Sequence, residues 1–130
     1  MNPSEPRGAI RNVVEALWEE LPGHFGGAYS KMLVRPEVCG ARRIDYRIST
    51  YQPRGYVEAH AHRVQEQVYH VLEGEGLMEL AGERRVVRRH DVVFVPPGVR
   101  HAIYNTGLTD LTFIVVTSPP DDTDPGSQAE

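Results

Sequence analysis

The sequence predicts an all-β domain, a sandwich or barrel, that is preceded by one amphipathic helix. Short segments of apolar or alternating residues follow one another between Lys31 and Thr117, and turns rich in glycine and proline, such as residues 53–55 and 74–76, separate them. Many short strands at regular spacing with such turns are typical of sandwiches and barrels. The chain has 130 residues and one cysteine, so we expect one domain with a hydrophobic core and no internal disulfide.

The expected elements follow from the spacing of the apolar residues. Between Ile10 and Leu21 they recur every three or four positions, which predicts a helix over residues 9–21 that ends at the Pro-Gly pair after it. His24 follows in a glycine-rich stretch and is expected in an exposed loop. The predicted strands cover residues 31–34, 43–51, 67–72, 77–80, 86–88, 92–95, 102–105 and 111–117.

These elements divide the chain into an N-terminal segment (1–29), a barrel (30–117) and a tail (118–130). The tail is acidic, has two consecutive prolines and lacks large apolar residues, so we expect it to be disordered. It holds 4 of the 18 acidic residues, and the remaining 14 equal the 14 lysines and arginines. The neutral body gives no support for nucleic-acid binding.

The sequence gives no sign of a membrane partner. No apolar run approaches the roughly 20 residues of a membrane span. The first eight residues carry proline, glutamate and arginine, where a secretory signal needs an apolar stretch. We therefore expect a cytoplasmic protein. No phosphate-binding loop or dinucleotide fingerprint is present.

Three of the six histidines lie in patterned surroundings. His60 and His62 are two residues apart, and on an extended chain such residues point to the same face, so both imidazoles can reach one ion. A pair of this kind is common without any function. His101, however, follows the turn at residues 96–100, which should direct the next strand inward. Together the three predict a metal site.

Residues 55–62 with Gly74, and residues 96–105, resemble the two short motifs of the cupin family. The resemblance covers about residues 43–117 and implies a cupin, that is, a jelly-roll β-barrel that binds one divalent metal ion and is commonly a homodimer. Three positions depart from the family pattern. Gly55 is one residue closer to the histidines, His90 stands where the second motif begins with glycine, and Gln67 stands where the first motif has glutamate.

The fourth ligand is Gln67 or its neighbour Glu66. The two side chains point to opposite faces of one strand, so only one can face the interior. The family spacing to Gly74 favours Gln67, whereas the spacing from His62 allows either. The resemblance thus implies a metal site made of His60, His62, Gln67 and His101.

A glutamine ligand has chemical consequences. Its carbonyl oxygen carries no charge, so three imidazoles and an amide leave the full +2 charge on the ion, which strengthens a Lewis acid and attracts anions. Zn, Ni, Fe, Mn and Cu are all compatible with such ligands. We expect a metal-dependent enzyme that acts on a small oxygenated molecule, an anionic one included, and stabilises an enolate-like intermediate, as an isomerase, cyclase or lyase. The alternatives are a metal-dependent dioxygenase and a non-catalytic barrel that binds a small molecule.

Other polar residues are expected near the site. Tyr69 shares the face of Gln67 and is the candidate catalytic residue, as an acid, a base or a hydrogen-bond donor; the alternative is a tyrosine packed in the barrel wall. Arg43 and Arg47 share the face of Tyr51. An inward arginine would bind a substrate carboxylate, whereas an outward one would be solvated.

Overall fold

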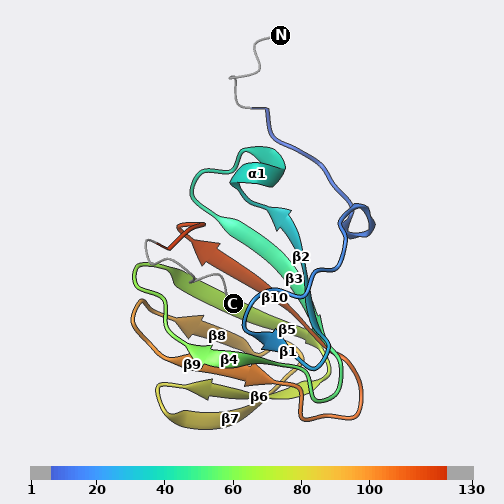
Figure 1. The fold of residues 1–130 in the computed structure, drawn as a ribbon, viewed down its shortest axis with the longest axis vertical. Helices are drawn as coiled ribbons and strands as arrows, with labels where there is room; N and C mark the ends of the chain where they lie inside the picture. Colours follow the sequence, from blue (N-terminus) through green and yellow to red (C-terminus); the bar gives the residue numbers. More distant parts are fainter. Residues whose placement is uncertain (1–6, 123–130) are drawn as a thin grey trace.

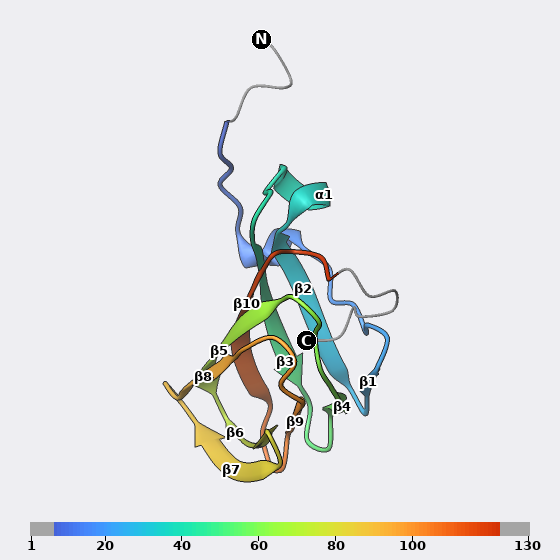
Figure 2. The same cartoon turned by 90° about the vertical axis from the view of Figure 1, so that its left-hand side faces the viewer.

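The computed structural model describes residues 7–122 and places their strands in two facing antiparallel sheets (Figures 1 and 2). One sheet has the order β2-β3-β10-β5-β8, and the other has the order β1-β4-β9-β6-β7. The strands are β1 (His24–Phe25), β2 (Ala28–Val34), β3 (Asp45–Tyr51), β4 (Tyr56–His60), β5 (Glu66–Glu73), β6 (Glu75–Leu80), β7 (Glu83–Arg88), β8 (Val92–Val95), β9 (His101–Tyr104) and β10 (Leu111–Ser118). The predicted all-β fold is confirmed.

Alternation along the strands builds the interior. In β10, Leu111, Phe113 and Val115 are buried, and the residues between them are partly exposed. This strand lies in the middle of its sheet, between β3 and β5, where β-branched and aromatic residues pack well. The Phe113 ring lies 5.0 Å from that of Tyr51 and 5.7 Å from that of Tyr69, measured between centroids. Burial of each such side chain contributes about 1.5–3 kcal/mol.

Gly74 forms the tight connection between β5 and β6. Its φ is +85°, and a Cβ at this position would lie 2.3 Å from the Asp110 carbonyl oxygen, so only glycine fits without displacing the backbone. On the other side of this turn region, Asn105 donates from Nδ2 to the carbonyls of Tyr51 (2.7 Å) and Thr109 (2.8 Å) and accepts at Oδ1 from the Gly107 N–H. Gly74 and Asn105, one from each motif, therefore fix the backbone of the barrel around these turns.

The helix predicted over residues 9–21 is wrong. The segment is mostly irregular, with a single 3-10 turn, η1 (Val13–Glu15), that Asn12 caps. In Figure 2 the start of this segment lies above the two sheets, and the chain then passes beside β2 on its way to β1. Ile10, Val14 and Leu17 stay exposed, and a short helix gains most of its stability by packing such an apolar face.

The backbone of the same segment pairs with a strand instead of forming a helix. The N–H and carbonyl of Glu19 both pair with Ser30 of β2, at 2.9 Å each, which requires an extended chain where the helix was predicted to continue. The α-helix among the described residues is the single turn α1 (Pro36–Cys39). It begins with proline and ends at Gly40, whose φ is +78°, and both are ordinary helix boundary signals. None of the helices within residues 7–122 has the length and apolarity to cross a membrane.

The start of the predicted disordered tail is ordered. β10 continues through Ser118, and the next residues cross to the loop that follows β4: Gln65 Nε2 donates to the Pro119 carbonyl at 3.1 Å. Asp121 pairs with Arg35 at 3.2 Å. The prediction is therefore wrong for residues 118–122, because both backbone and side-chain groups of this segment pair with residues far away in the sequence, which composition does not reveal. Residues 123–130 of the predicted tail lie outside the described part of the chain.

Candidate metal centre

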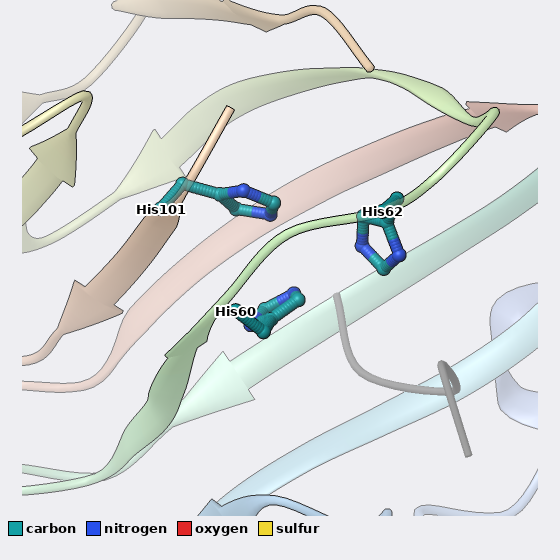
Figure 3. Close-up of side chains that lie close together, drawn as sticks. All are labelled: His60, His62 and His101. Carbon is teal, nitrogen blue, oxygen red and sulfur yellow. The ribbon is translucent and has the colours of Figure 1, made fainter. Parts of the chain in front are cut away.

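The three predicted histidines meet at one end of the barrel, between the two sheets. His60 is the last residue of β4, His101 is the first residue of β9, and these two residues are register partners in neighbouring antiparallel strands. His62 follows two residues after His60. One ligand nitrogen from each histidine lies within 4.8 Å of those from the other two. Figure 3 shows the three rings converging on a common space.

Hydrogen bonds to the backbone orient two of these rings. His60 Nδ1 lies 2.6 Å from the Glu58 carbonyl oxygen, and His101 Nδ1 lies 2.9 Å from the Val99 carbonyl oxygen. A carbonyl oxygen can only accept, so both Nδ1 atoms donate. In a neutral imidazole the proton on Nδ1 leaves Nε2 with its lone pair. Nε2 is therefore the nitrogen of each ring that could bind a metal ion, and outer hydrogen bonds of this kind orient histidines in known metal sites.

His62 is oriented by other groups. Its backbone carbonyl accepts from the Gly98 N–H at 2.7 Å, which ties the turn before His101 to the loop that carries His62. Its Nδ1 lies 3.9 Å from Asp122 Oδ2. His62 is 3% exposed. The two sequence motifs are therefore joined directly by a backbone hydrogen bond beside the site.

Gln67 and Glu66 lie on opposite faces of β5. Gln67 is 2% exposed and faces the interior, whereas Glu66 is exposed on the outer face. Gln67 Nε2 donates to Thr117 Oγ1 at 3.1 Å, and the amide oxygen is not used in this bond. Gln67 Oε1 is buried and has no hydrogen-bond partner among the described residues. A buried acceptor of this kind fits a ligand to a cation.

Tyr69 is fully buried two residues along the same inner face. Its ring centroid lies 6.1 Å from that of His101 and 5.7 Å from that of Phe113. It therefore stands at the boundary between the histidines and the apolar core.

The two arginines separate. Arg43 is exposed, whereas Arg47 is 8% exposed and faces the interior. Arg47 binds both carboxylate oxygens of Asp45, at 2.9 and 2.7 Å, and Arg35 also reaches this carboxylate. Arg47 thus uses for Asp45 the donors that would otherwise bind a substrate carboxylate. This arginine is part of a buried ion-pair network.

His24 is a buried residue that the sequence did not reveal. It is 3% exposed, pairs with Val57 of β4, and its ring meets that of Tyr51 edge-on at 6.0 Å. The prediction of an exposed loop is wrong because β1 is a strand of only two residues between glycines, too short for an alternation pattern. The positive φ values of Gly23, +78°, and Gly26, +72°, are the local signal of the tight turns around it.

Another pair of histidines lies on the outer surface. His70 Nε2 is 3.3 Å from His90 Nδ1. Within residues 7–122 the triad of His60, His62 and His101 is the single group of three or more histidine, cysteine or carboxylate side chains close enough to hold one ion. Within the same residues, the surface pair of His70 and His90 has no third member.

Comparison with known proteins identifies the family of this chain. Residues 47–117 match the family model described as a cupin domain. The chain belongs to the cupin family. This membership accounts for the jelly-roll arrangement of the two sheets and for the position of both histidine motifs at one end of the barrel.

Curated relatives are similar over part of this cupin. An uncharacterized protein of Methanocaldococcus jannaschii is 38% identical over 61 residues, 47% of this chain and 49% of its own length. An oxalate-binding protein of Thermotoga maritima is 38% identical over 64 residues, 49% of this chain and 53% of its own length. A tetracenomycin polyketide synthase protein of Streptomyces glaucescens is 26% identical over 104 residues, 80% of this chain and 70% of its own. The chain thus spans about half the length of the first two.

Solved structures are similar over most of the cupin. A protein from Thermotoga maritima described as a predicted oxalate decarboxylase has a TM-score of 0.76 at 26% identity, over 85% of this chain and 98% of the other. KdgF from a Halomonas species has a TM-score of 0.75 at 20% identity, over 89% of this chain and 97% of the other. At that identity, KdgF shows the fold alone.

Proposed function

We propose that this cupin is a metal-dependent enzyme that acts on a small oxygenated molecule, an anionic one included, by isomerase, cyclase or lyase chemistry. The proposed ligands are His60, His62, Gln67 and His101. The observation that carries the proposal is the neutral donor set: two imidazoles fixed to present Nε2, a third imidazole beside them, and a buried carbonyl oxygen, Gln67 Oε1, without a partner.

A divalent ion held by these groups supplies Lewis-acid chemistry that stabilises negative charge on substrate oxygens. None of the four ligands is charged, so the ion keeps its +2 charge, whereas a carboxylate ligand would reduce the charge of the centre to +1. This supports a reaction that develops charge on oxygen over one that needs the metal to change its oxidation state. Zn, Ni and Mn suit such a role, and Fe or Cu would favour the alternative, a dioxygenase.

Tyr69 is proposed as the catalytic residue that moves a proton or donates a hydrogen bond to the substrate. It is buried beside His101 at the edge of the histidine cluster, where exclusion of water strengthens such a bond. Replacing it with phenylalanine keeps the ring that packs on Phe113 and removes the hydroxyl alone.

A second candidate function is binding of a small dicarboxylate without conversion. It is favoured by the Thermotoga maritima relative, which is described as an oxalate-binding protein. The two candidates differ in whether a bound molecule is chemically changed.

Proton exchange in D₂O tests the enzymatic proposal without knowledge of the natural substrate. The zinc- or nickel-loaded protein is mixed with a panel of small 2-oxo and 3-oxo acids, and deuterium incorporation next to the carbonyl is followed by NMR. We expect exchange with wild type and His90→Ala, none above background with His101→Ala, and about 100-fold slower exchange with Tyr69→Phe. Tight binding with no exchange would contradict the enzyme and favour the binding barrel, and oxygen consumption would favour the dioxygenase.

A further inference from the structure

The C-terminal segment after β10 closes over the loop that carries His62. Pro119 accepts a hydrogen bond from Gln65 Nε2 at 3.1 Å, and the Gln65 side chain belongs to a residue that is 5% exposed. Three residues later, Asp122 reaches the same loop. The segment thus makes three hydrogen bonds with three consecutive residues of the loop, Arg63, Val64 and Gln65, and restrains the loop as a unit.

Asp122 makes the most specific of these contacts. Its side chain is fully buried, and each carboxylate oxygen accepts from a different backbone N–H: Oδ2 from Arg63 at 2.6 Å and Oδ1 from Val64 at 2.8 Å. Bonds from backbone N–H groups to an ionised carboxylate are among the stronger hydrogen bonds in proteins. The two donors directly follow His62 in the chain, so they fix the backbone immediately after it.

The same carboxylate faces the His62 ring. Oδ2 lies 3.9 Å from His62 Nδ1, which is too long for a hydrogen bond but close enough for electrostatic attraction to a proton on that nitrogen. His60 and His101 use backbone carbonyls for the same purpose. His62 thus differs from the other two histidines by having a carboxylate at its outer nitrogen.

We propose that Asp122 is a positioning residue for the metal centre: it holds the His62 loop and orients His62 so that its other ring nitrogen faces the ion. The inference rests on the proposed metal-binding function. None of the proposed ligands carries a negative charge, and Asp122 supplies one outside the ligand set. There it increases the donor strength of His62 without occupying a coordination position. The C-terminal segment, which is remote from the cupin motifs in sequence, thereby becomes part of the site.

Metal affinity tests this role in the full chain. Zn²⁺ affinity is measured by competition with a chromophoric chelator for wild type, Asp122→Asn and Asp121→Asn. Asp121 is the matched control because it is the neighbouring carboxylate, is 64% exposed and pairs with Arg35 instead of the loop. Asn at position 122 keeps the size of the side chain but loses its charge and one acceptor. We expect Asp122→Asn to weaken zinc binding by about 10–100-fold and Asp121→Asn to leave it unchanged.

Two further readouts separate positioning from general stability. The visible absorption bands of the Co²⁺-loaded protein should shift in Asp122→Asn and stay in place in Asp121→Asn, because the bands report the geometry around the ion. In the metal-free protein, the Arg63 and Val64 amides should lose protection from hydrogen exchange in Asp122→Ala. Equal zinc affinity in wild type and Asp122→Asn, or an equal loss in Asp121→Asn, overturns the inference and leaves the proposed function standing. Absence of metal binding by wild type overturns both.

Discussion

The barrel interior has two ends with different chemistry, although the same strands build both. The histidine end contains His60, His62, Gln67 and His101, and the apolar end contains Tyr51, Val71, Ile103, Leu111 and Phe113. In β9 the change takes two residues, from His101 to Ile103, and in β5 it takes four, from Gln67 to Val71. Side chains at both ends are buried, with His60 half-buried, yet those at the apolar end stabilise the fold by burial, whereas those at the histidine end bury polar atoms that need a partner.

The comparison teaches that burial alone does not assign a role. Phe113 and His101 are both 0% exposed. The former is surrounded by aromatic rings that complete its contacts, and the latter presents a nitrogen toward two other histidines. Substitutions at the apolar end should therefore change stability, and substitutions at the histidine end should change metal binding.

The largest expected effect on stability is that of Phe113→Ala. Removing this ring leaves a cavity between Tyr51 and Tyr69, and such substitutions cost about 3–5 kcal/mol. Urea unfolding measures the loss, and the folded fraction should still bind metal. Ile114→Ala, on the partly exposed opposite face of β10, is the control and should cost less. Equal losses would remove the distinction between the two faces.

The next effect is the loss of metal-induced stabilisation in His101→Ala. A ligand that binds the folded state alone stabilises it by about 2.7 kcal/mol at 100 times its dissociation constant. Wild type and His90→Ala should gain this stability when the metal is added, and His101→Ala should gain none. Thermal unfolding with and without metal measures it. A similar gain in His101→Ala would show that metal binds elsewhere, for example at the surface pair.

Gly74→Ala should cost about 1–3 kcal/mol or more, because alanine is strained at a φ of +85° and its Cβ would approach the Asp110 carbonyl. Gly82→Ala is a close control, since Gly82 has a φ of +83° but nothing within 4 Å of the added Cβ. The difference between the two variants in urea unfolding isolates the close approach. No difference would mean that the barrel backbone yields at this turn.

The smallest effect is expected for Leu17→Ser. This side chain is 83% exposed, and substitutions at such positions usually change the free energy of unfolding by less than about 0.5 kcal/mol. Loss of stability by several times that amount would mean that the segment before β1 is packed in solution. The helix predicted there would then merit a new test by circular dichroism of the variant.

Much of the fold and the core of the candidate site followed from local rules. The strand at Val92–Val95 was predicted with its observed bounds, and β10 differs from its prediction by one residue. The pairing of His60 and His62 required only that the chain be extended. The choice of Gln67 over Glu66 as the inward residue came from the resemblance to the cupin motif, through its spacing to Gly74, because local rules allowed either residue.

Two of the failures have the same physical cause, which is pairing with residues outside the segment itself, and the third comes from a very short strand. The helix over residues 9–21 had the right period but no surface on which to pack, and Glu19 paired with Ser30 instead. Asp122 looked like part of a solvated acidic tail, yet its carboxylate binds backbone N–H groups nearly sixty residues earlier. His24 was hidden by the shortness of its strand. Composition and periodicity carry no information about such partners.

Metal content tests the central claim most directly. Wild type, His90→Ala, His101→Ala and Gln67→Ala are incubated with a mixture of Zn, Ni, Mn, Fe and Cu ions, desalted and measured by elemental mass spectrometry. We predict about one tightly held ion per chain in wild type and His90→Ala, none in His101→Ala, and a reduced amount in Gln67→Ala, because each removed ligand weakens a four-ligand site. An ion content in wild type that is no higher than in His101→Ala would contradict the account.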